Sequence, residues 1–217
     1  MYDCHTHTFF SDGVLGPAEL IRRGETLGLK GIVLADHVDS TTLSSTLENQ
    51  LAGIDEIRRR VDIEVVVGCE LTHVHPESIA SLAREARELG AELIGVHGET
   101  AVEPVAPGTN RAAVDCQEVD FLAHPGLIEK DLCSRARENN VYLELTARKG
   151  HARTNGHLRK VAGGDSSLLV INSDAHQPQD LIDREEAETV IRGAGHPSPE
   201  KILQNNKDLF REAKRDD

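Results

Sequence analysis

The sequence predicts an α/β fold in which parallel strands alternate with helices and close into a barrel. Short apolar runs rich in Val, Ile and Leu alternate with amphipathic segments along the 217 residues, as expected for strands that are covered on both faces. Seven such strand-then-helix units follow one another, and seven or eight units close most economically into a barrel of the TIM type. An open, doubly wound sheet is the alternative, but no GxGxxG pattern follows the first predicted strand to support nucleotide binding.

The individual strands and helices are predicted from the apolar runs and from the proline and glycine residues between them. The predicted strands cover residues 2–5, 31–35, 63–69, 93–96, 119–123, 141–145 and 168–171. The predicted helices cover residues 17–27, about 47–60, 76–89, about 110–116, 130–139, about 151–161, 179–192 and 199 to about 214. Proline stands at three helix starts and glycine follows two helix ends. No linker divides the chain, so we predict one domain over residues 1–217, with a core over about 1–195.

The charge balance excludes some partners. The chain has 24 basic and 37 acidic side chains, a formal net charge of −13, whereas general binding to nucleic-acid backbones or anionic membranes needs a positive face. Aromatic residues make up 3% of the chain and Trp is absent, which disfavours stacking platforms for single-stranded nucleic acid. We therefore predict no membrane partner and no general nucleic-acid partner, and a local positive site would have to come from metal ions.

Cysteine usage and hydropathy indicate the compartment. The four cysteines are scattered and form no CxxC pair, which argues against a zinc ribbon or a redox motif. We expect them to be reduced and mostly buried. No run of about 18 apolar residues exists, and the first residues carry neither a basic leader nor an apolar run. The sequence therefore predicts a cytoplasmic protein.

Residues of the metal-ligand type stand where six of the seven predicted strands end. They are His5 and His7, Asp36 and His37, Glu70, His97, His124, and Asp174 with His176, and Asp12 lies in the loop after the first strand. Only the strand that ends in Glu144-Leu145-Thr146 departs from this pattern. In a parallel barrel the chemistry sits at the carboxyl ends of the strands. We therefore expect these side chains to meet at one rim.

The donor types indicate which ions the rim would bind. In His5-Thr6-His7 both imidazoles project from the same side of an extended strand, so both can reach one ion. Six imidazoles and three carboxylates are too many for a single ion, so we predict two or three. Nitrogen and oxygen donors without thiolate suit Zn²⁺, Mn²⁺ or Fe²⁺. Such a cluster would attract an anionic ester and activate a water molecule. Asp36 is expected to accept a hydrogen bond from an imidazole and fix its tautomer.

These motifs resemble those of the PHP family, the polymerase and histidinol phosphatase domain. The resemblance rests on His5-Thr6-His7 with Ser11-Asp12-Gly13, Asp36-His37, Gly68-Cys69-Glu70, His97-Gly98, Ala123-His124-Pro125-Gly126 and Ser173-Asp174-Ala175-His176. It runs in order from residue 2 to about 176. By appearance the chain is most similar to the short, stand-alone subgroup of histidinol-phosphatase-like members.

The resemblance implies a distorted (β/α)7 TIM-like barrel with a trinuclear metal site at the carboxyl ends of the strands. By the family pattern, one ion is held by His5, His7, Glu70 and Asp174, a second by Glu70, His97 and His124, and a third by Asp12, His37 and His176. It also implies a metal-dependent phosphoesterase, often a phosphomonoesterase, in which a metal-bridging hydroxide attacks phosphorus. Glu70, Asp174 and His176 are predicted to be catalytic.

The segment after the sixth predicted strand supplies candidate substrate contacts. It concentrates Arg148, Lys149, His151, Arg153 and His157 where that strand has no predicted ligand of its own. Guanidinium and ammonium groups bind phosphate, and a histidine can protonate the leaving alkoxide. A second HxH, His73-Val74-His75, is expected to be loop structure rather than an accessory metal site.

Together these observations predict a phosphatase acting on a small phosphorylated metabolite, with histidinol phosphate and nucleotide phosphates as leading substrates. A nuclease or phosphodiesterase of the same family is one alternative, and a non-catalytic interaction domain stabilised by metals is another. An amidohydrolase, whose barrel also opens with HxH, would call for a lysine on the strand that ends at His97. No lysine lies between Lys30 and Lys130.

Overall fold

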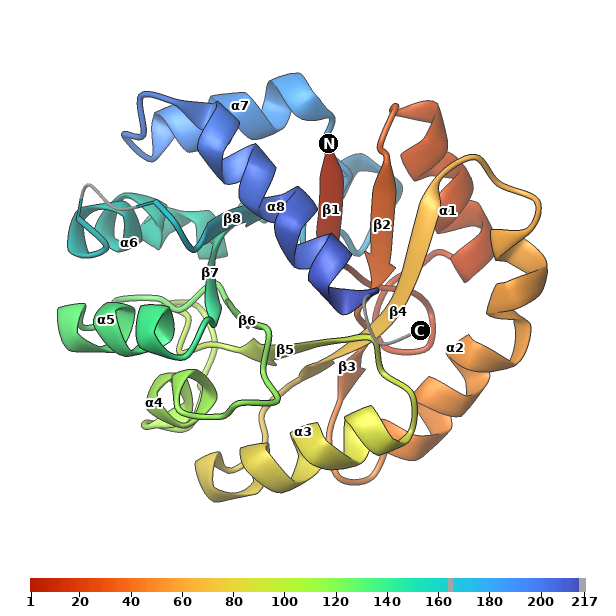
Figure 1. Cartoon of the computed structure of the whole chain (residues 1–217), viewed down its shortest axis with the longest axis horizontal. Coiled ribbons are helices and arrows are strands. Elements are labelled where there is room, and N and C mark those ends of the chain that lie inside the picture. Colours follow the sequence, from red (N-terminus) through yellow and green to blue (C-terminus); the bar gives the residue numbers. More distant parts are fainter. Residues whose placement is uncertain (164–165, 215–217) are drawn as a thin grey trace.

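A ring of parallel strands surrounded by helices forms the computed structural model, which describes residues 1–163 and 166–214 (Figure 1). The strands are β1 (Tyr2–Thr6), β2 (Gly31–Leu34), β3 (His37–Val38), β4 (Glu64–Leu71), β5 (Leu93–His97), β6 (Phe121–Ala123), β7 (Tyr142–Thr146) and β8 (Leu169–Asn172). Their order is β1-β2-β4-β5-β6-β7-β8, with β3 paired to the end of β4, and the ladders are parallel. The predicted TIM-like barrel of seven parallel strands is confirmed, and the two-residue β3 is an addition to it.

Helices connect the strands along the outside of the barrel. They are α1 (Pro17–Thr26), α2 (Leu43–Arg58), α3 (Ile79–Glu88), α4 (Thr109–Val114), α5 (Lys130–Glu138), α6 (Asn155–Val161), α7 (Arg184–Gly193) and α8 (Pro199–Ala213). Short 3-10 turns precede three of them: η1 (Pro76–Ser78), η2 (His151–Thr154) and η3 (Pro178–Asp180). Among the described residues, no helix is long and apolar enough to cross a membrane.

Of the helix starts that differ from the prediction, two are set by local hydrogen bonds. Helix α2 begins at Leu43 rather than near residue 47, since the backbone N–H of Leu43 donates to the carbonyl of Asp39 over 3.0 Å. Helix α7 begins at Arg184 rather than at residue 179. Its start is a capping box in which Asp183 and Glu186 satisfy each other's backbone N–H groups. Such boxes fix a helix start more strongly than hydrophobic periodicity does.

Helix α8 closes the amino end of the barrel, and Figure 1 shows it lying across that end of the ring. Leu209 and Phe210 on α8 join Tyr2, Phe121 and other strand side chains in one apolar cluster inside the barrel. The rings of Tyr2 and Phe210 are 4.9 Å apart. Gly31 is required beside them, because a Cβ there would lie 2.7 Å from the Phe210 ring. Full burial of one such aromatic side chain contributes about 2–3 kcal/mol.

Strands β1 and β8 meet at a seam that side chains, rather than a continuous ladder, hold together. One isolated bridge, Thr6 with Ala175, joins the two segments at the carboxyl end. Below it, Oδ1 of Asn172 accepts from the backbone N–H of Cys4 over 2.8 Å. The amide of Asn206 on α8 bonds the N–H and the carbonyl of Ile171 over 2.9 and 2.7 Å and also donates to Asn172. Helix α8 therefore completes the barrel wall as well as its floor.

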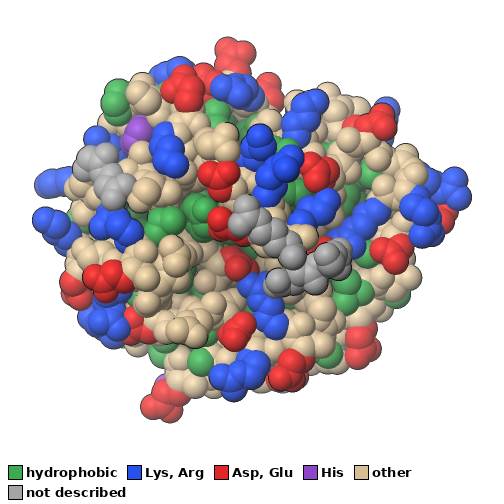
Figure 2. Space-filling view, in the orientation of Figure 1, with side chains coloured by type: hydrophobic (Ala, Val, Ile, Leu, Met, Phe, Trp, Pro, Cys, Tyr) green, Lys and Arg blue, Asp and Glu red, His purple; other side chains and the backbone are tan. Residues whose placement is uncertain are grey.

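The surface over α8 carries charges of both signs without a large patch of either (Figure 2). This distribution agrees with an acidic protein whose chemistry lies elsewhere, at the opposite end of the barrel.

Candidate metal centre

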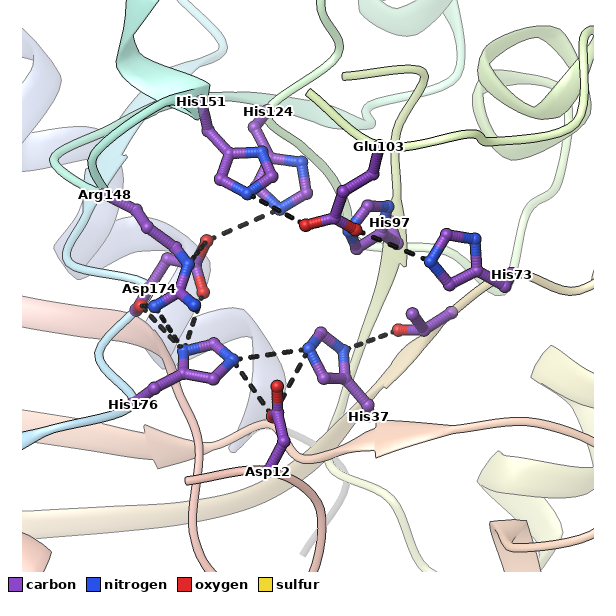
Figure 3. A pocket seen from close by; sticks show the side chains of 11 residues that line it. Asp12, His37, His73, His97, Glu103, His124, Arg148, His151, Asp174 and His176 are labelled. Atoms are coloured by element: carbon purple, nitrogen blue, oxygen red, sulfur yellow. Dashed lines mark hydrogen bonds and ion pairs between the residues drawn. The ribbon is translucent and has the colours of Figure 1, made fainter. Parts of the chain in front are cut away.

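The nine predicted ligands lie at the carboxyl end of the barrel, where six of them line one cavity (Figure 3). The other three, His5, His7 and Glu70, are buried and do not line it. Seven of them are buried: His5, His7, Glu70, His97, His124, Asp174 and His176. His37 is half-buried, and Asp12 is exposed on the loop between β1 and α1. The parallel ladders bring these residues together because each strand ends at the same rim.

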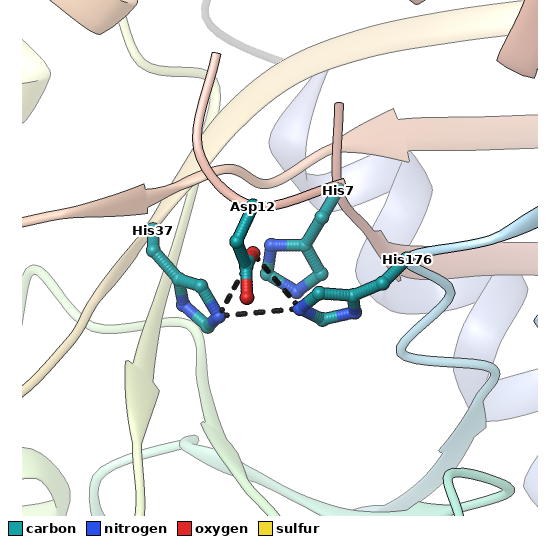
Figure 4. Close-up of side chains that lie close together, drawn as sticks. All are labelled: His7, Asp12, His37 and His176. Atoms are coloured by element: carbon teal, nitrogen blue, oxygen red, sulfur yellow. Dashed lines mark hydrogen bonds and ion pairs between the residues drawn. The ribbon is translucent and has the colours of Figure 1, made fainter. Parts of the chain in front are cut away.

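His7, Asp12, His37 and His176 form the outermost group (Figure 4). Oδ1 of Asp12 is 3.0 Å from Nε2 of His176 and 3.6 Å from Nε2 of His37, and those two nitrogens are 3.4 Å apart. Four ligands placed 2.0–2.1 Å from a tetrahedral ion are separated by roughly 3.3 Å. The group therefore has the spacing that one divalent ion requires, and it contains the three residues predicted for the third ion.

A deeper group contains the four residues predicted for the first ion. Nε2 of His7 is 3.2 Å from Oδ1 of Asp174, and Nε2 of His5 is 3.5 Å from Oε2 of Glu70. The remaining separations are 3.9 Å between His5 and Asp174 and 4.0 Å between His7 and Glu70. These side chains also have room for one ion between them.

The residues predicted for the second ion are brought together only in part. Nε2 of His124 lies 3.6 Å from Oε1 of Glu70, as that prediction requires. The ring of His97 is 4.5 Å from the ring of His124, but its Nε2 faces Oε2 of Glu103 at 3.1 Å. Glu103 was not predicted, because it stands in a loop six residues beyond the strand end. The assignment of His97 to the second ion stays a prediction.

The electrostatics of the buried groups favour the metal-binding form at some of the predicted ligands and the protonated form at others. Burial alone would raise the pKa of Glu70, but the His5, His37 and His97 imidazoles lower it well below its usual value. Burial lowers the pKa values of His7 and His124 well below the ordinary value, and neighbouring imidazoles lower them further. Burial raises the pKa of Asp174 to about 7. An anionic Glu70 and neutral His7 and His124 are the forms that coordinate metal ions. The pKa of His5 is instead raised well above its ordinary value, because the Glu144, Glu70 and Asp174 carboxylates outweigh its burial, so an ion bound there would displace a proton.

Several buried polar atoms in this centre have no hydrogen-bond partner. They are Nε2 of His5, both ring nitrogens of His7, Nδ1 of His97 and of His124, Oε1 of Glu70 and Oδ1 of Asp174. An unpaired buried polar group costs about 1–3 kcal/mol, so such groups call for a specific explanation, and an ion is one. The donors are imidazole nitrogens and carboxylate oxygens, the set that suits Zn²⁺, Mn²⁺ or Fe²⁺. The residues present therefore fit divalent transition-metal ions.

Glu144 is a functional candidate that the sequence reasoning missed. This buried carboxylate on β7 accepts from Nδ1 of His5 over 2.8 Å and from the backbone N–H of His124 over 3.0 Å. A proton held on Nδ1 leaves Nε2 of His5 free to coordinate. Its place at a strand end was the available signal, since Glu144 occupies the one strand that departs from the predicted ligand pattern.

Asp36 does not hold an imidazole, contrary to the prediction. Its carboxylate accepts from the N–H and hydroxyl of Thr8 over 2.7 and 2.6 Å, from the hydroxyl of Ser11 over 2.6 Å, and from the amide of Gln50 over 2.6 Å. Thr8 and Ser11 belong to the loop that carries Asp12. Asp36 therefore fixes that loop, and it acts on the metal centre through Asp12 rather than through a histidine.

The predicted substrate contacts separate into two groups. Arg148 and His151 line the cavity, whereas Lys149 and Arg153 are exposed and do not line it. His157 bonds the carbonyl of Ile128 through Nε2 over 2.9 Å. The roles of all five in substrate binding stay predictions, and the structure favours Arg148 and His151.

The two histidines of the second HxH, His73 and His75, lie in different surroundings. Nδ1 of His75 accepts from the N–H of Glu77 and caps the turn η1, as expected of loop structure. His73 instead lines the cavity, with Nε2 3.5 Å from Oε2 of Glu103. The His97 imidazole, which pairs with Glu103, lowers the pKa of that carboxyl to about 2.

Three relatives illustrate what the chain is similar to. It is 45% identical over 195 residues to an uncharacterized protein of Methanocaldococcus jannaschii, a match that covers 89% of each chain. It is 28% identical over 195 residues to ribonuclease P protein component 3 of Methanosarcina mazei, covering 83% of this chain and 74% of that one. It is 30% identical over 139 residues to a protein of Shewanella piezotolerans named probable phosphatase, covering 54% of this chain and 56% of that one.

The model of the PHP domain family matches residues 3–162. This stretch is well over half of the chain and contains seven of the nine predicted ligands, from His5 to His124. The resemblance seen in the motifs is confirmed: the chain belongs to the PHP domain family.

Proposed function

We propose that this protein is a metal-dependent phosphoesterase, and that its substrate is the phosphomonoester of a small metabolite. The observation that carries the proposal is the convergence of histidines and carboxylates on one small cavity that also has an arginine at its edge. Membership of the PHP family and the partial match to a protein named probable phosphatase support the same reaction class.

The size and lining of the cavity favour a small anionic group. Its volume is about 170 Å³, and Arg148 lines it together with Asp12, His37 and His176. Clefts that enclose a drug-sized ligand are larger, about 300–1,000 Å³. A phosphate group would fit inside while its alcohol portion extends toward the solvent. The net charge of −13 makes a long nucleic-acid substrate less favourable than a compact ester.

Different residues of this chain would then bind the ions and keep the ligands in position. The three predicted groups of ligands, which together comprise His5, His7, Asp12, His37, Glu70, His97, His124, Asp174 and His176, would hold two or three divalent ions. When bound, such ions make water a stronger nucleophile at neutral pH and neutralise charge on phosphate oxygens. Glu144 would keep His5 oriented, and Asp36 would keep the Asp12 loop in place.

Arg148 would bind the phosphate in this proposal. One of its terminal nitrogens is 2.8 Å from Nδ1 of His176, and its guanidinium lies 3.7 Å from Asp174 and 3.8 Å from Asp180. These partners hold it at the edge of the cavity, where its remaining N–H groups can bind two phosphate oxygens.

His151 is the candidate for proton transfer to the leaving group. Its Nδ1 is 2.7 Å from the hydroxyl of Thr100, and its Nε2 faces Glu103 at 3.4 Å. Because a carboxylate only accepts hydrogen bonds, this arrangement puts the proton on Nε2, toward the cavity. From there it can reach a leaving alkoxide.

The test combines elemental analysis with a phosphomonoester panel. Purified protein supplied with Zn²⁺, Mn²⁺ or Fe²⁺ is expected to hydrolyse p-nitrophenyl phosphate and at least one of histidinol phosphate and the nucleoside mono- and bisphosphates. His124→Ala should lower turnover at least about a hundredfold, since loss of a metal ligand costs more than loss of a residue that orients one. Unchanged turnover in that variant would contradict the proposed site.

A second candidate function belongs in the same assay because a relative over most of the chain is a ribonuclease P protein component. This protein would then act on RNA, or would bind it without catalysis and use metals for stability. Short single-stranded oligonucleotides added to the panel separate the two functions. Cleavage of oligonucleotides alone, or binding without cleavage of any ester, would replace the phosphomonoesterase proposal.

A further inference from the structure

A cluster at the mouth of the cavity combines one predicted ligand, His97, with two residues outside the predicted set. Oε2 of Glu103 lies 3.1 Å from Nε2 of His97 and 3.5 Å from Nε2 of His73. One ligand atom from each of the three residues falls within 4.8 Å of the others. Figure 3 shows Glu103 reaching into the cavity, with one carboxylate oxygen toward His151 and the other toward His97 and His73.

The distances and donor types match a metal site. Ligands of a tetrahedral ion at 2.0–2.1 Å are about 3.3 Å apart, and the two measured separations lie on either side of this value. Two imidazoles, one carboxylate and a free fourth position form a donor set that occurs in catalytic zinc sites. His97 is only 2% exposed, and Nε2, the nitrogen that would bind the ion, is the one that faces Glu103.

The loop that carries Glu103 is anchored on both sides of it. The carboxylate of Glu99 accepts from the N–H groups of Gly108 and Asn110 over 3.0 and 2.9 Å, and Oδ1 of Asn110 accepts from the N–H of Glu99 over 2.9 Å. Thr100 contacts Nδ1 of His151 at 2.7 Å. These bonds hold the loop against the rim, so that Glu103 stands over His97.

His73 reaches the same point through an uncommon backbone conformation. Its φ is +53°, and the other non-glycine residues with positive φ among those described are His124, Asn140 and Asp174. Two of these three are predicted metal ligands. Positive φ costs a non-glycine residue about 1 kcal/mol or more, and such strain tends to be kept at functional sites. The ring of His73 lies 5.2 Å from the ring of His97.

We propose that Glu103 and His73 bind the divalent ion that Nε2 of His97 holds, and that they add two loop ligands to the nine predicted ones. This ion lies at the mouth of the cavity, where its open position faces an entering substrate. The proposal concerns ion binding, so it does not depend on which ester the protein hydrolyses.

The experiment compares Glu103→Gln and His73→Asn with the matched control His75→Asn. His75 belongs to the same HxH but caps η1, and Asn is a good capping residue. Metal-free forms of the full chain are titrated with Zn²⁺ and with Co²⁺, and bound ions per chain are measured by equilibrium dialysis and by the visible absorption of Co²⁺. We expect Glu103→Gln and His73→Asn each to weaken one ion tenfold or more, while His75→Asn matches the wild type.

Equal ion number and equal affinity in all four proteins would overturn the proposal. Far-UV circular dichroism and thermal unfolding check that each variant is folded. If Glu103→Gln fails to fold, His73→Asn decides the outcome, because the His73 side chain is 47% exposed and its replacement leaves the core intact. A wild type without phosphomonoesterase activity would refute the proposed function but would leave this result unaffected, since no substrate is present in the titration.

Discussion

The two ends of the barrel are built from the same strands but by opposite rules. At the amino end, Tyr2 and Phe210 fill the interior with buried apolar side chains. At the carboxyl end, imidazoles and carboxylates face one another with unpaired polar atoms, and both His124 and Asp174 have positive φ. The amino end stabilises the fold, whereas the carboxyl end uses part of that stability to hold groups that would otherwise be solvated. Stability and chemistry are therefore separated along the barrel axis.

The largest expected effect comes from emptying the amino end. Phe210→Ala should lower the free energy of unfolding by about 3–5 kcal/mol, because a buried aromatic is lost and a cavity remains. The measurement is urea unfolding of the metal-free protein. Phe9→Ala is the control, since Phe9 is 57% exposed and its loss should cost about 0.5 kcal/mol or less. Equal losses in the two variants would contradict the assigned role of α8.

Asp3 tests the seam between β1 and β8, where its Oδ1 accepts from the backbone N–H of Ser173 over 3.2 Å. Burial raises the pKa of Asp3 from 3.8 to about 6, so the folded state binds its proton more tightly than the unfolded state does. The resulting loss of stability is absent below about pH 3.8, grows as the pH rises toward 6, and is complete above that, when it reaches about 3 kcal/mol.

In the metal-free protein, Asp3→Asn should therefore gain stability relative to the wild type as the pH rises from about 4 to about 7. The readout is the difference between the two unfolding curves as a function of pH, which cancels the other titrating groups. The exposed Asp131→Asn serves as control and should show no such slope. Parallel curves for Asp3→Asn and the wild type would refute the prediction.

His7 should show the trade-off at the carboxyl end. His7→Leu is expected to lower metal-dependent turnover at least about a hundredfold, which corresponds to about 2.7 kcal/mol in the activation free energy. The same variant should stabilise the metal-free protein by about 1–2 kcal/mol, because two unpaired buried nitrogens disappear. Because burial lowers the pKa of His7 from its ordinary 6.5, the wild type loses stability as the pH falls below 6.5, and the gain should grow there. A variant that is both inactive and less stable than the wild type at every pH would contradict the idea that the carboxyl end gives up stability for metal binding.

Glu144 should give the smallest of these effects. Glu144→Gln keeps the shape of the side chain but weakens the acceptor for Nδ1 of His5, so Zn²⁺ affinity should fall about 10–100-fold. Competition with a chromophoric chelator measures the affinity. Glu138→Gln, on the exposed part of α5, is the matched control and should bind as the wild type does. The assigned role fails if both variants bind equally well.

Much of the fold could be predicted because the spacing of apolar residues and the positions of proline and glycine indicate the same helices and strands. All seven strands of the ring were predicted within two residues at each end, since most of them are short apolar runs between polar helices. The start of α2 could not be found this way, because the Ser- and Thr-rich stretch of residues 44–46 resembles a loop and only the contacts of Asp39 and the burial of Leu43 make it helical. Strand β3 depends on pairing with β4 alone.

The metal centre was predictable where ligands follow strands and unpredictable where they come from loops. His5, Glu70 and Asp174 are fixed by the parallel ladders, so their position in the sequence determines their position in space. Glu103 and His151 reach the cavity through loops whose path depends on long-range bonds such as that between Thr100 and His151. Asp36 could not be assigned correctly for the same reason, because its partners Thr8 and Gln50 lie on two different segments.

The asparagine pair at the seam also bears on how the molecule is made. Asn206 joins the last strand to α8, and its amide also lies 3.3 Å from the carbonyl of Tyr2 in the first strand. A growing polypeptide therefore cannot complete the ring until residue 206 has left the ribosome. His5 and Asp174 stand on opposite edges of that junction, so we expect ion capture to follow the docking of α8.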